Sequence, residues 1–284
     1  MSLGILTNVA ATYAENNLNQ TQNSLQNVLQ QLSSGSRINS GADDAAGLSI
    51  ADGLTANEAA LNQSAQNAQN GVGLLQTADG ALSQVTNLLD RAVTLATEAS
   101  NGGLTLAQSG AADTEFQSIL TEIGNIGSTT NFNSSAVFNG AAPTTFVLSD
   151  GTAAGVTTIS AAATALTATS IGGVTFSATD TLTGATAAAG QASAQTTLTD
   201  ITNAISGISA ARGSIGANIN QLNAAANVAS SEEVNLSSAQ SAILSTNFGQ
   251  ATSDLAKFQV LSQTGISALA QANSSQQEIL KLLQ

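Results

Sequence analysis

Apolar side chains recur every three or four residues along most of the chain, and this spacing divides the sequence into three parts. Residues 1–139 and 191–284 follow the pattern, whereas residues 140–190 do not. A 3-4 spacing is typical of helices that pack along a narrow apolar seam, as in a coiled coil. The sequence therefore predicts two helical arms, one toward each end of the chain, separated by a stretch of another kind.

The outermost apolar stripes lie at the two ends of the chain. Their residues are spread thinly, and helices with so little apolar surface are not stable alone in water. We therefore expect the two ends to pack against each other, with a surface that can later be buried against a neighbour. The residues predicted to form this assembly seam are Leu18, Leu25, Val28, Leu32, Leu255, Phe258, Ile266, Leu269, Ile279 and Leu283.

Further helices are predicted between these ends. One stripe runs over residues 61–96, a shorter one covers 116–126, and the longest extends over 198–243. The sequence Asn-Gly-Gly at 101–103 is a typical end for the first of these, because glycine readily takes the left-handed conformation that closes a helix.

Residues 33–47 (SSGSRINSGADDAAG) interrupt the helical spacing and predict a loop. Asp43 or Asp44 is placed to cap the next helix, since a carboxylate can accept hydrogen bonds from the free amides of a first turn. Pairing of either carboxylate with Arg37 is an alternative. The spacing of a calcium-binding loop is missing, so a metal ligand is the least favoured interpretation.

Residues 140–190 are rich in Thr, Ala, Gly and Ser and contain the single proline of the chain. Two runs with β-branched residues, 144–148 and 174–177, predict short strands joined by glycine turns. The expected fold class is mainly α. Long antiparallel helices would form a terminal coiled coil and a helical rod, with a small β-rich or irregular central insert.

The outer faces of the predicted helices carry amides and hydroxyls where charged residues are usual. Residues 16–31 (NNLNQTQNSLQNVLQQ) contain no charge. Burial of an amide that finds a partner costs much less than burial of a charge. Such a surface can be solvated in a monomer and then buried against a neighbour. Compositional drift that leaves only a weakly stable helix is the alternative interpretation.

Composition excludes several kinds of chemistry. The chain has 284 residues with neither Cys nor His, so Ser-His-Asp and Cys nucleophile sites, the usual zinc sites and His-ligated haem lack their residues. The net charge of −13 disfavours nucleic acid and anionic membranes as partners. No apolar run approaches a membrane span, and residues 1–20 do not resemble a cleaved signal peptide. We therefore expect no cofactor, no metal, no membrane insertion and no enzymatic activity.

Two blocks of sequence carry a family resemblance. Residues 32–54 (LSSGSRINSGADDAAGLSIADGL) closely resemble the N-terminal signature of bacterial flagellins, and residues 212–283 resemble the C-terminal block of that family, with ALAQAN at 268–273. Residues 131–140 (NFNSSAVFNG) look like the family's exit into its variable outer region. The resemblance covers roughly residues 1–140 and 191–284.

This resemblance implies an extracellular subunit that assembles with itself into the helical flagellar filament used for swimming. It implies three regions: residues 1–40 with 245–284 as the inner core, 41–139 with 191–244 as an outer tube, and 140–190 as a surface insert. It also implies export by the flagellar type III apparatus without cleavage of a signal peptide. An export chaperone and cap or junction proteins would be further partners.

The resemblance also implies a possible patch for an innate immune receptor, Toll-like receptor 5. The segments NLLDRAVTLA (87–96) and DTEFQSILTEI (113–123) map this patch onto Arg91, Leu95 and Glu115. Asp90 and Val93-Thr94 depart from the family's pattern, which has Gln and Arg-Glu there. The alternative is that Arg91 makes an ion pair between subunits or between helices.

Two other functions remain open from the sequence. A hook–filament junction protein of the same superfamily would share the terminal blocks but would join or cap a filament rather than build it. A chemoreceptor-like signalling hairpin is also a long coiled coil rich in Ala, Ser and Gln. Such hairpins usually carry more charge and are attached to a membrane span.

Overall fold

The structure, a computed structural model, describes residues 8–138, 144–152, 157–161 and 165–282. These residues form five helices, so the expected mainly α fold is confirmed. The helices are α1 (Val9–Ser34), α2 (Ala45–Ser100), α3 (Leu106–Thr129), α4 (Ala187–Leu244) and α5 (Phe248–Leu282). The chain divides into two compact units, one made of Met1–Ala56 with Asn235–Gln284 and the other of Asn57–Val234.

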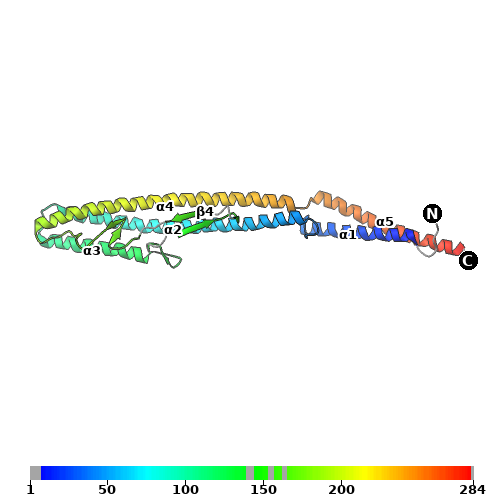
Figure 1. The fold of residues 1–284 in the computed structure, drawn as a ribbon, viewed down its shortest axis with the longest axis horizontal. Coiled ribbons are helices and arrows are strands. Elements are labelled where there is room, and N and C mark those ends of the chain that lie inside the picture. Colours follow the sequence, from blue (N-terminus) through cyan, green and yellow to red (C-terminus); the bar gives the residue numbers. More distant parts are fainter. Residues whose placement is uncertain (1–7, 139–143, 153–156, 162–164, 283–284) are drawn as a thin grey trace. The chain divides into compact units, whose positions relative to one another are not determined.

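In the first unit, α1 and α5 lie side by side and run in opposite directions (Figure 1). The side chain of Asn8 accepts a hydrogen bond from the Ala11 amide and caps the start of α1. The same side chain donates to the carbonyl oxygen of Ala272 at 3.0 Å and so ties the start of α1 to α5. Gly35 ends α1 in the left-handed conformation, with φ at 72°. The predicted pairing of the two chain ends is therefore confirmed within one chain.

In the second unit, α2 and α4 are antiparallel neighbours, and α3 folds back along α2 (Figure 1). Apolar residues from all three helices point into a common core. Phe116 on α3 is fully buried, and its ring lies 6.4 Å from that of Phe176, which follows the last strand. The other large, fully buried apolar side chains of the helices are Leu75, Val85, Leu89, Ile123, Ile201 and Leu222.

The helix ends follow from local sequence. Asp44 accepts a hydrogen bond from the Gly47 amide at 2.8 Å, so it is the residue that caps α2. α2 ends at Ser100, directly before the predicted Asn-Gly-Gly terminator. Thr105 and Gln108 form a reciprocal capping box at the start of α3.

Between α3 and α4 in the sequence, the described residues form three antiparallel hairpins. β1 (Asn131–Phe132) pairs with β2 (Ser135–Ala136), β3 (Thr144–Leu148) pairs with β4 (Thr157–Ala161), and β5 (Ser170–Ile171) pairs with β6 (Val174–Thr175). The predicted strand at 144–148 is confirmed. The predicted strand at 174–177 is shorter, and β4 was not predicted, because its short alternating run differs little from the Thr- and Ala-rich sequence around it.

The β5–β6 hairpin packs closely on α4. Its two central residues, Gly172 and Gly173, have φ of 58° and 81°, the left-handed values that a two-residue turn requires. A Cβ on Gly207 of α4 would overlap the carbonyl oxygen of Gly172. Only hydrogen atoms fit between the two backbones at this point, and Ile171 next to the turn is fully buried.

This close packing modifies the expectation that residues 140–190 form a surface insert. Part of the insert is exposed, but six of its described apolar side chains lie in the core of the second unit. They are Leu148, Ile159, Leu166, Ile171, Phe176 and Leu182. The insert therefore completes the core on which the helices depend.

We predict that replacing Phe116 by alanine lowers the free energy of unfolding of the second unit by about 3–5 kcal/mol, because it empties a fully enclosed site. Urea titrations read by hydrogen exchange in α3 would measure this. Leu106 is the control: it lies on the same helix and is 48% exposed, so its replacement by alanine should change the value by less than about 0.5 kcal/mol. Equal losses for both variants would contradict the proposed core.

Candidate functional site

The terminal helix pair α1–α5 has an incomplete core. No residue of α1 is fully buried. The predicted seam residues of α1, together with three of those on α5, are half-buried. They are Leu18, Leu25, Val28, Leu32, Leu255, Phe258 and Leu269. Leu283 and the side chain of Ile279 lie outside the described residues. The pair thus buries one stripe per helix and leaves the remaining faces to solvent.

Ile266 does not point into this pair. Its side chain is 49% exposed, and its neighbour Gly265 occupies the inward position, where an added Cβ would lie 3.2 Å from Leu18. A spacing of three or four residues fits either residue 265 or residue 266 as the one that faces α1. In the structure it is Gly265, the smaller of the two, that faces α1. If Ile266 takes part in assembly, as predicted, it does so from the outer face of α5 and not from the contact between α1 and α5.

Because glycine fills little space, a groove opens beside Gly265. It has a volume of about 370 Å³ and is lined by small or apolar groups of both helices, including Ala14, Leu18, Leu261 and Ala268. A shallow apolar groove between two helices is the shape that accepts a side chain from another helix.

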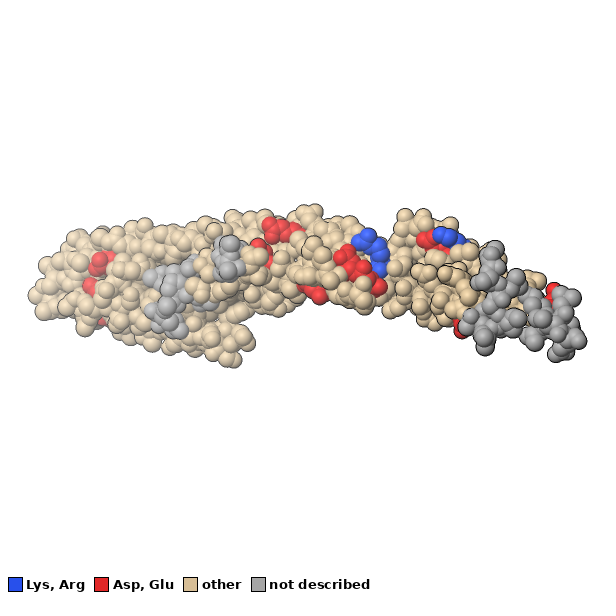
Figure 2. Space-filling view, turned by 45° about the vertical axis from the view of Figure 1, so that its right-hand side comes forward, with Lys and Arg blue, Asp and Glu red and all other residues tan. Residues whose placement is uncertain are grey.

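The outward faces of α1 and α5 carry large apolar side chains. Tyr13 is 68% exposed and Val260 is 65% exposed. Most of the face drawn in Figure 2 bears neither acidic nor basic side chains. Charged side chains such as Lys257 on α5 are few among these exposed apolar groups, and contiguous exposed apolar patches mark surfaces that become covered. The further exposed apolar residues of these two helices are Val9, Leu29, Phe248, Leu261 and Ile266.

The loop between α1 and α2 is held by hydrogen bonds to backbone carbonyls at the end of α4. The Arg37 amide donates to the Leu244 carbonyl at 2.6 Å, and the Arg37 guanidinium donates to the Ile243 carbonyl at 2.9 Å. Since carbonyls at the C-terminal end of a helix have no partner within the helix, a guanidinium there satisfies them. In the described residues Arg37 makes no ion pair with Asp43 or Asp44, so this alternative was wrong.

Asp43 organises the loop itself. Its carboxylate accepts hydrogen bonds from the amides of Asn39 and Ser40 and from the Ser40 hydroxyl. These donors stabilise the ionised form, and the hydrogen bond from the Asn39 amide contributes most to lowering the pKa of Asp43. The two adjacent carboxylates therefore have separate structural roles, with Asp43 closing the loop and Asp44 starting α2.

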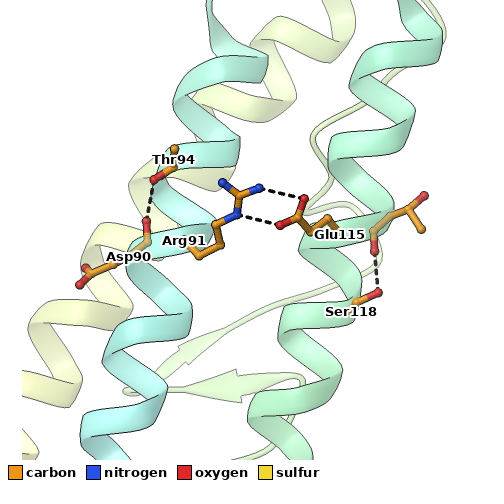
Figure 3. Close-up of polar contacts among 6 residues, drawn as sticks. Asp90, Arg91, Thr94, Glu115 and Ser118 are labelled. Atoms are coloured by element: carbon orange, nitrogen blue, oxygen red, sulfur yellow. Dashed lines mark hydrogen bonds and ion pairs between the residues drawn. The ribbon is translucent and has the colours of Figure 1, made fainter.

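Arg91 on α2 and Glu115 on α3 form a two-pronged ion pair (Figure 3). The guanidinium Nε lies 2.7 Å from one carboxylate oxygen, and Nη2 lies 3.1 Å from the other. The hydrogen bonds lower the pKa of Glu115 and raise that of Arg91. The helix-to-helix ion pair, one of the two alternatives for Arg91, is the arrangement present within this chain.

Leu95, the third residue of the predicted receptor patch, is not on the surface. It is 3% exposed and belongs to the core of the second unit. Arg91 and Leu95 lie four residues apart on α2, so one helix turn separates them, but Arg91 is exposed whereas Leu95 is packed in the core. A receptor approaching this face would contact Arg91 and Glu115 without reaching Leu95.

A second ion pair joins α2 to α4. Arg212 Nε lies 2.7 Å from a carboxylate oxygen of Asp79, and the pair raises the pKa of Arg212. Sequence reasoning placed both residues in apolar stripes and missed the pair. The sequence did contain a signal for this pair. The apolar stripe over 61–96 is interrupted by the acidic Asp79, and the stripe over 198–243 is interrupted by the basic Arg212.

Two further features of the structure concern metal binding and membrane spanning. Among the described residues, no group of three or more acidic side chains is close enough together to hold a metal ion. Within the same part of the chain, no helix combines the length and apolarity needed to cross a bilayer.

We predict that the stabilisation from Glu115 disappears in acid. The folded pKa lies below the unfolded one, so the contribution is complete above the unfolded pKa and is lost as pH falls through the folded pKa. The difference in melting temperature between the parent and a Glu115→Gln variant should therefore shrink toward zero at low pH. Circular dichroism melts across the acidic range would measure it.

Glu122→Gln is the matched control for this prediction. Glu122 lies on the same helix and accepts a hydrogen bond from the neutral side-chain amide of Asn125. Its replacement should produce no comparable pH-dependent difference. A difference for Glu115→Gln that stays constant across the acidic range would show that the ion pair is not responsible.

The comparisons with known proteins agree at both ends of the chain. Residues 5–142 match the bacterial flagellin N-terminal helical region, and residues 198–283 match the bacterial flagellin C-terminal helical region. B-type flagellin of Pseudomonas aeruginosa is 40% identical over 145 residues, which are 51% of this chain and 30% of that protein. Flagellin B of Vibrio cholerae serotype O1 is 37% identical over 140 residues, which are 49% of this chain and 37% of that protein.

Among solved structures, the crystal structure of Bacillus cereus flagellin is similar, with 27% identity and a TM-score of 0.46. The similarity covers 57% of this chain and 88% of that one. The chain aligns with 30–37% of the length of the two curated relatives named above. Because the two matched regions together cover most of the sequence in the order expected for the family, this chain belongs to the bacterial flagellins.

Proposed function

We propose that this chain is a structural, non-catalytic subunit that assembles with copies of itself into the helical filament of the bacterial flagellum. The observation that carries this proposal is the incomplete α1–α5 pair, in which seam residues are half-buried while large apolar groups remain exposed on the outer faces. A two-helix pair of this kind gains stability by burying those faces, at about 25 cal/mol per Å² before the cost of ordering.

The proposed regions of the filament subunit correspond approximately to the two compact units. Residues 1–40 with 245–284 are proposed to form the inner layer of the filament, and residues 41–139 with 191–244 the outer tube. The boundary proposed from the sequence lies near residues 40 and 245, whereas the compact units divide at 56 and 235. Residues 140–190 would lie at the outer surface of the tube and contribute to its core.

An open polymer requires contacts between different surfaces on successive subunits. A contact whose two sides differ does not close on itself and so generates a helix. The groove beside Gly265 and the exposed apolar faces of the same helix pair supply two unlike surfaces. Supercoiling of the filament would follow from subunits that switch between two packings of similar free energy.

Location and other partners complete the proposal. The filament would be extracellular, and the subunit would leave the cell through the flagellar type III apparatus with the help of an export chaperone. Cap and junction proteins would contact the ends of the filament. The main alternative is a hook–filament junction protein, which would use the same terminal helices without polymerising; micrometre-long filaments formed by the purified chain would exclude it.

Recognition by Toll-like receptor 5 is a second candidate function. It rests on Arg91 and Glu115, whose side chains are 52% and 45% exposed on adjacent helices. A receptor reporter assay on the monomer should lose signal with Arg91→Ala. An unchanged signal would remove this function while leaving self-assembly intact.

We predict that Leu25→Asp or Leu269→Asp abolishes polymerisation. Each places a charge in the half-buried stripe of the terminal pair, where desolvation of a carboxylate is costly. Electron microscopy and sedimentation of the concentrated protein would measure the loss. Hydrogen exchange of residues 61–130 should be unchanged, because these residues lie in the other unit.

Leu269→Met is the matched control. It preserves the apolar character and nearly the volume of the side chain, so filaments should still form. Filaments of normal length from both aspartate variants would contradict the proposed function.

A further inference from the structure

The turn between α2 and α3 contains an asparagine followed by glycine, a pair whose chemistry depends strongly on its surroundings. Asn101 and Gly102 lie directly after the end of α2, and both are exposed. Asparagine can react with the next residue's amide nitrogen when that nitrogen is accessible and the backbone can turn. Glycine in the second position removes the side chain that would obstruct the approach.

The hydrogen bonds around Asn101 leave the two reacting groups available. The Asn101 amide donates to the Glu98 carbonyl at 3.2 Å. In the part of the chain that the structure describes, no hydrogen bond restrains the side-chain amide of Asn101 or the backbone N–H of Gly102. Gly102 has a φ of 64°. The flexible side chain of Gln191 would lie 3.2 Å from a Cβ on Gly102, and Gly103 follows in open space, so no backbone packs against the turn at these two glycines.

The chain contains a second asparagine–glycine pair in the opposite environment. Asn70 and Gly71 lie in the interior of α2, more than twenty residues from either end, where the Gly71 nitrogen belongs to the helical hydrogen-bond ladder. Gly71 is buried, and a Cβ there would lie 2.9 Å from Leu222. Cyclisation at Asn70 would therefore require opening of the helix and of the core. A third pair, at 139–140, lies outside the described residues.

We infer that Asn101 is a site of spontaneous deamidation and isoaspartate formation, and that Asn70 is protected from the same reaction by the fold. The Gly102 nitrogen attacks the Asn101 side-chain carbonyl carbon and loses its proton. The side-chain nitrogen leaves as ammonia, and a five-membered succinimide forms. Water then opens the ring at either carbonyl and gives aspartate or isoaspartate, so no other reactant is needed.

The product would change the turn. Either form adds a negative charge at the C-terminal end of α2, where the helix dipole disfavours it, three residues from Glu98. Isoaspartate also adds a methylene to the backbone between α2 and α3. The inference is independent of self-assembly, since it concerns covalent chemistry within one chain.

The experiment is incubation of the folded full chain in mildly alkaline buffer, followed by cleavage after glutamate and mass spectrometry. Cleavage after Glu58, Glu98 and Glu115 places Asn70 in the peptide 59–98 and Asn101 in the peptide 99–115. Conversion at Asn101 should be at least about tenfold faster than at Asn70, because a turn opens far more readily than the interior of a packed helix. In denaturant the two rates should converge.

Asn101→Gln is the control variant, because its longer side chain would have to form a six-membered ring and reacts much more slowly. Peptide 99–115 of this variant should keep its mass through the incubation. Equal rates at Asn70 and Asn101 in the folded chain would overturn the inference. Retention of the Asn101 amide, under conditions that convert it in denaturant, would also overturn it.

Discussion

The width of the apolar stripe on α1 and α5 is the constraint on which the terminal unit depends. A helix in a two-helix pair can bury only the stripe that faces its partner, and here that stripe contains residues such as Leu18 and Leu269 that remain half-exposed. The other unit escapes this limit because α2 packs against both α3 and α4, so that Leu75 and Leu89 become fully enclosed. The difference is a third helix: with it, the second unit completes its core within one chain, whereas the α1–α5 pair can complete its core only against a neighbouring molecule.

The scarcity of charge has a related physical meaning. Burying a charged side chain between helices costs several kcal/mol unless it is well paired, whereas an amide or hydroxyl can exchange water for a protein partner at much smaller cost. The two ion pairs among the described residues, Arg91–Glu115 and Arg212–Asp79, both join helices of the second unit. Their charges are neutralised inside one chain. The terminal helices instead expose mainly amides, hydroxyls and apolar groups, which remain compatible with later burial.

Much of the fold could be predicted from the sequence because it is encoded locally. The 3-4 spacing predicted the helices, and the Asn-Gly-Gly sequence predicted the end of α2. An aspartate was expected to cap the start of the same helix. The errors arose where contacts between helices decide which side chains are buried and which are paired. Periodicity could not choose between Gly265 and Ile266, and helix spacing alone could not reveal that Leu95 lies in the core. The pairing of Asp79 with Arg212 needed knowledge of which two stripes face each other.

The insert illustrates the same distinction between local and tertiary information. Its sequence predicts short strands joined by glycine turns, and the family resemblance implies a surface position. The β5–β6 hairpin nevertheless reaches α4 so closely that Gly172 and Gly207 leave no room for side chains between them. Leu166 and Phe176 then enter the core from outside the helices. The hairpin acts as an additional packing element, and α1 and α5 have no such element in the described part of their own unit. The second unit thus completes its core within the chain, whereas the core of the α1–α5 pair stays incomplete. The exposed apolar faces of α1 and α5 can be covered only by another molecule.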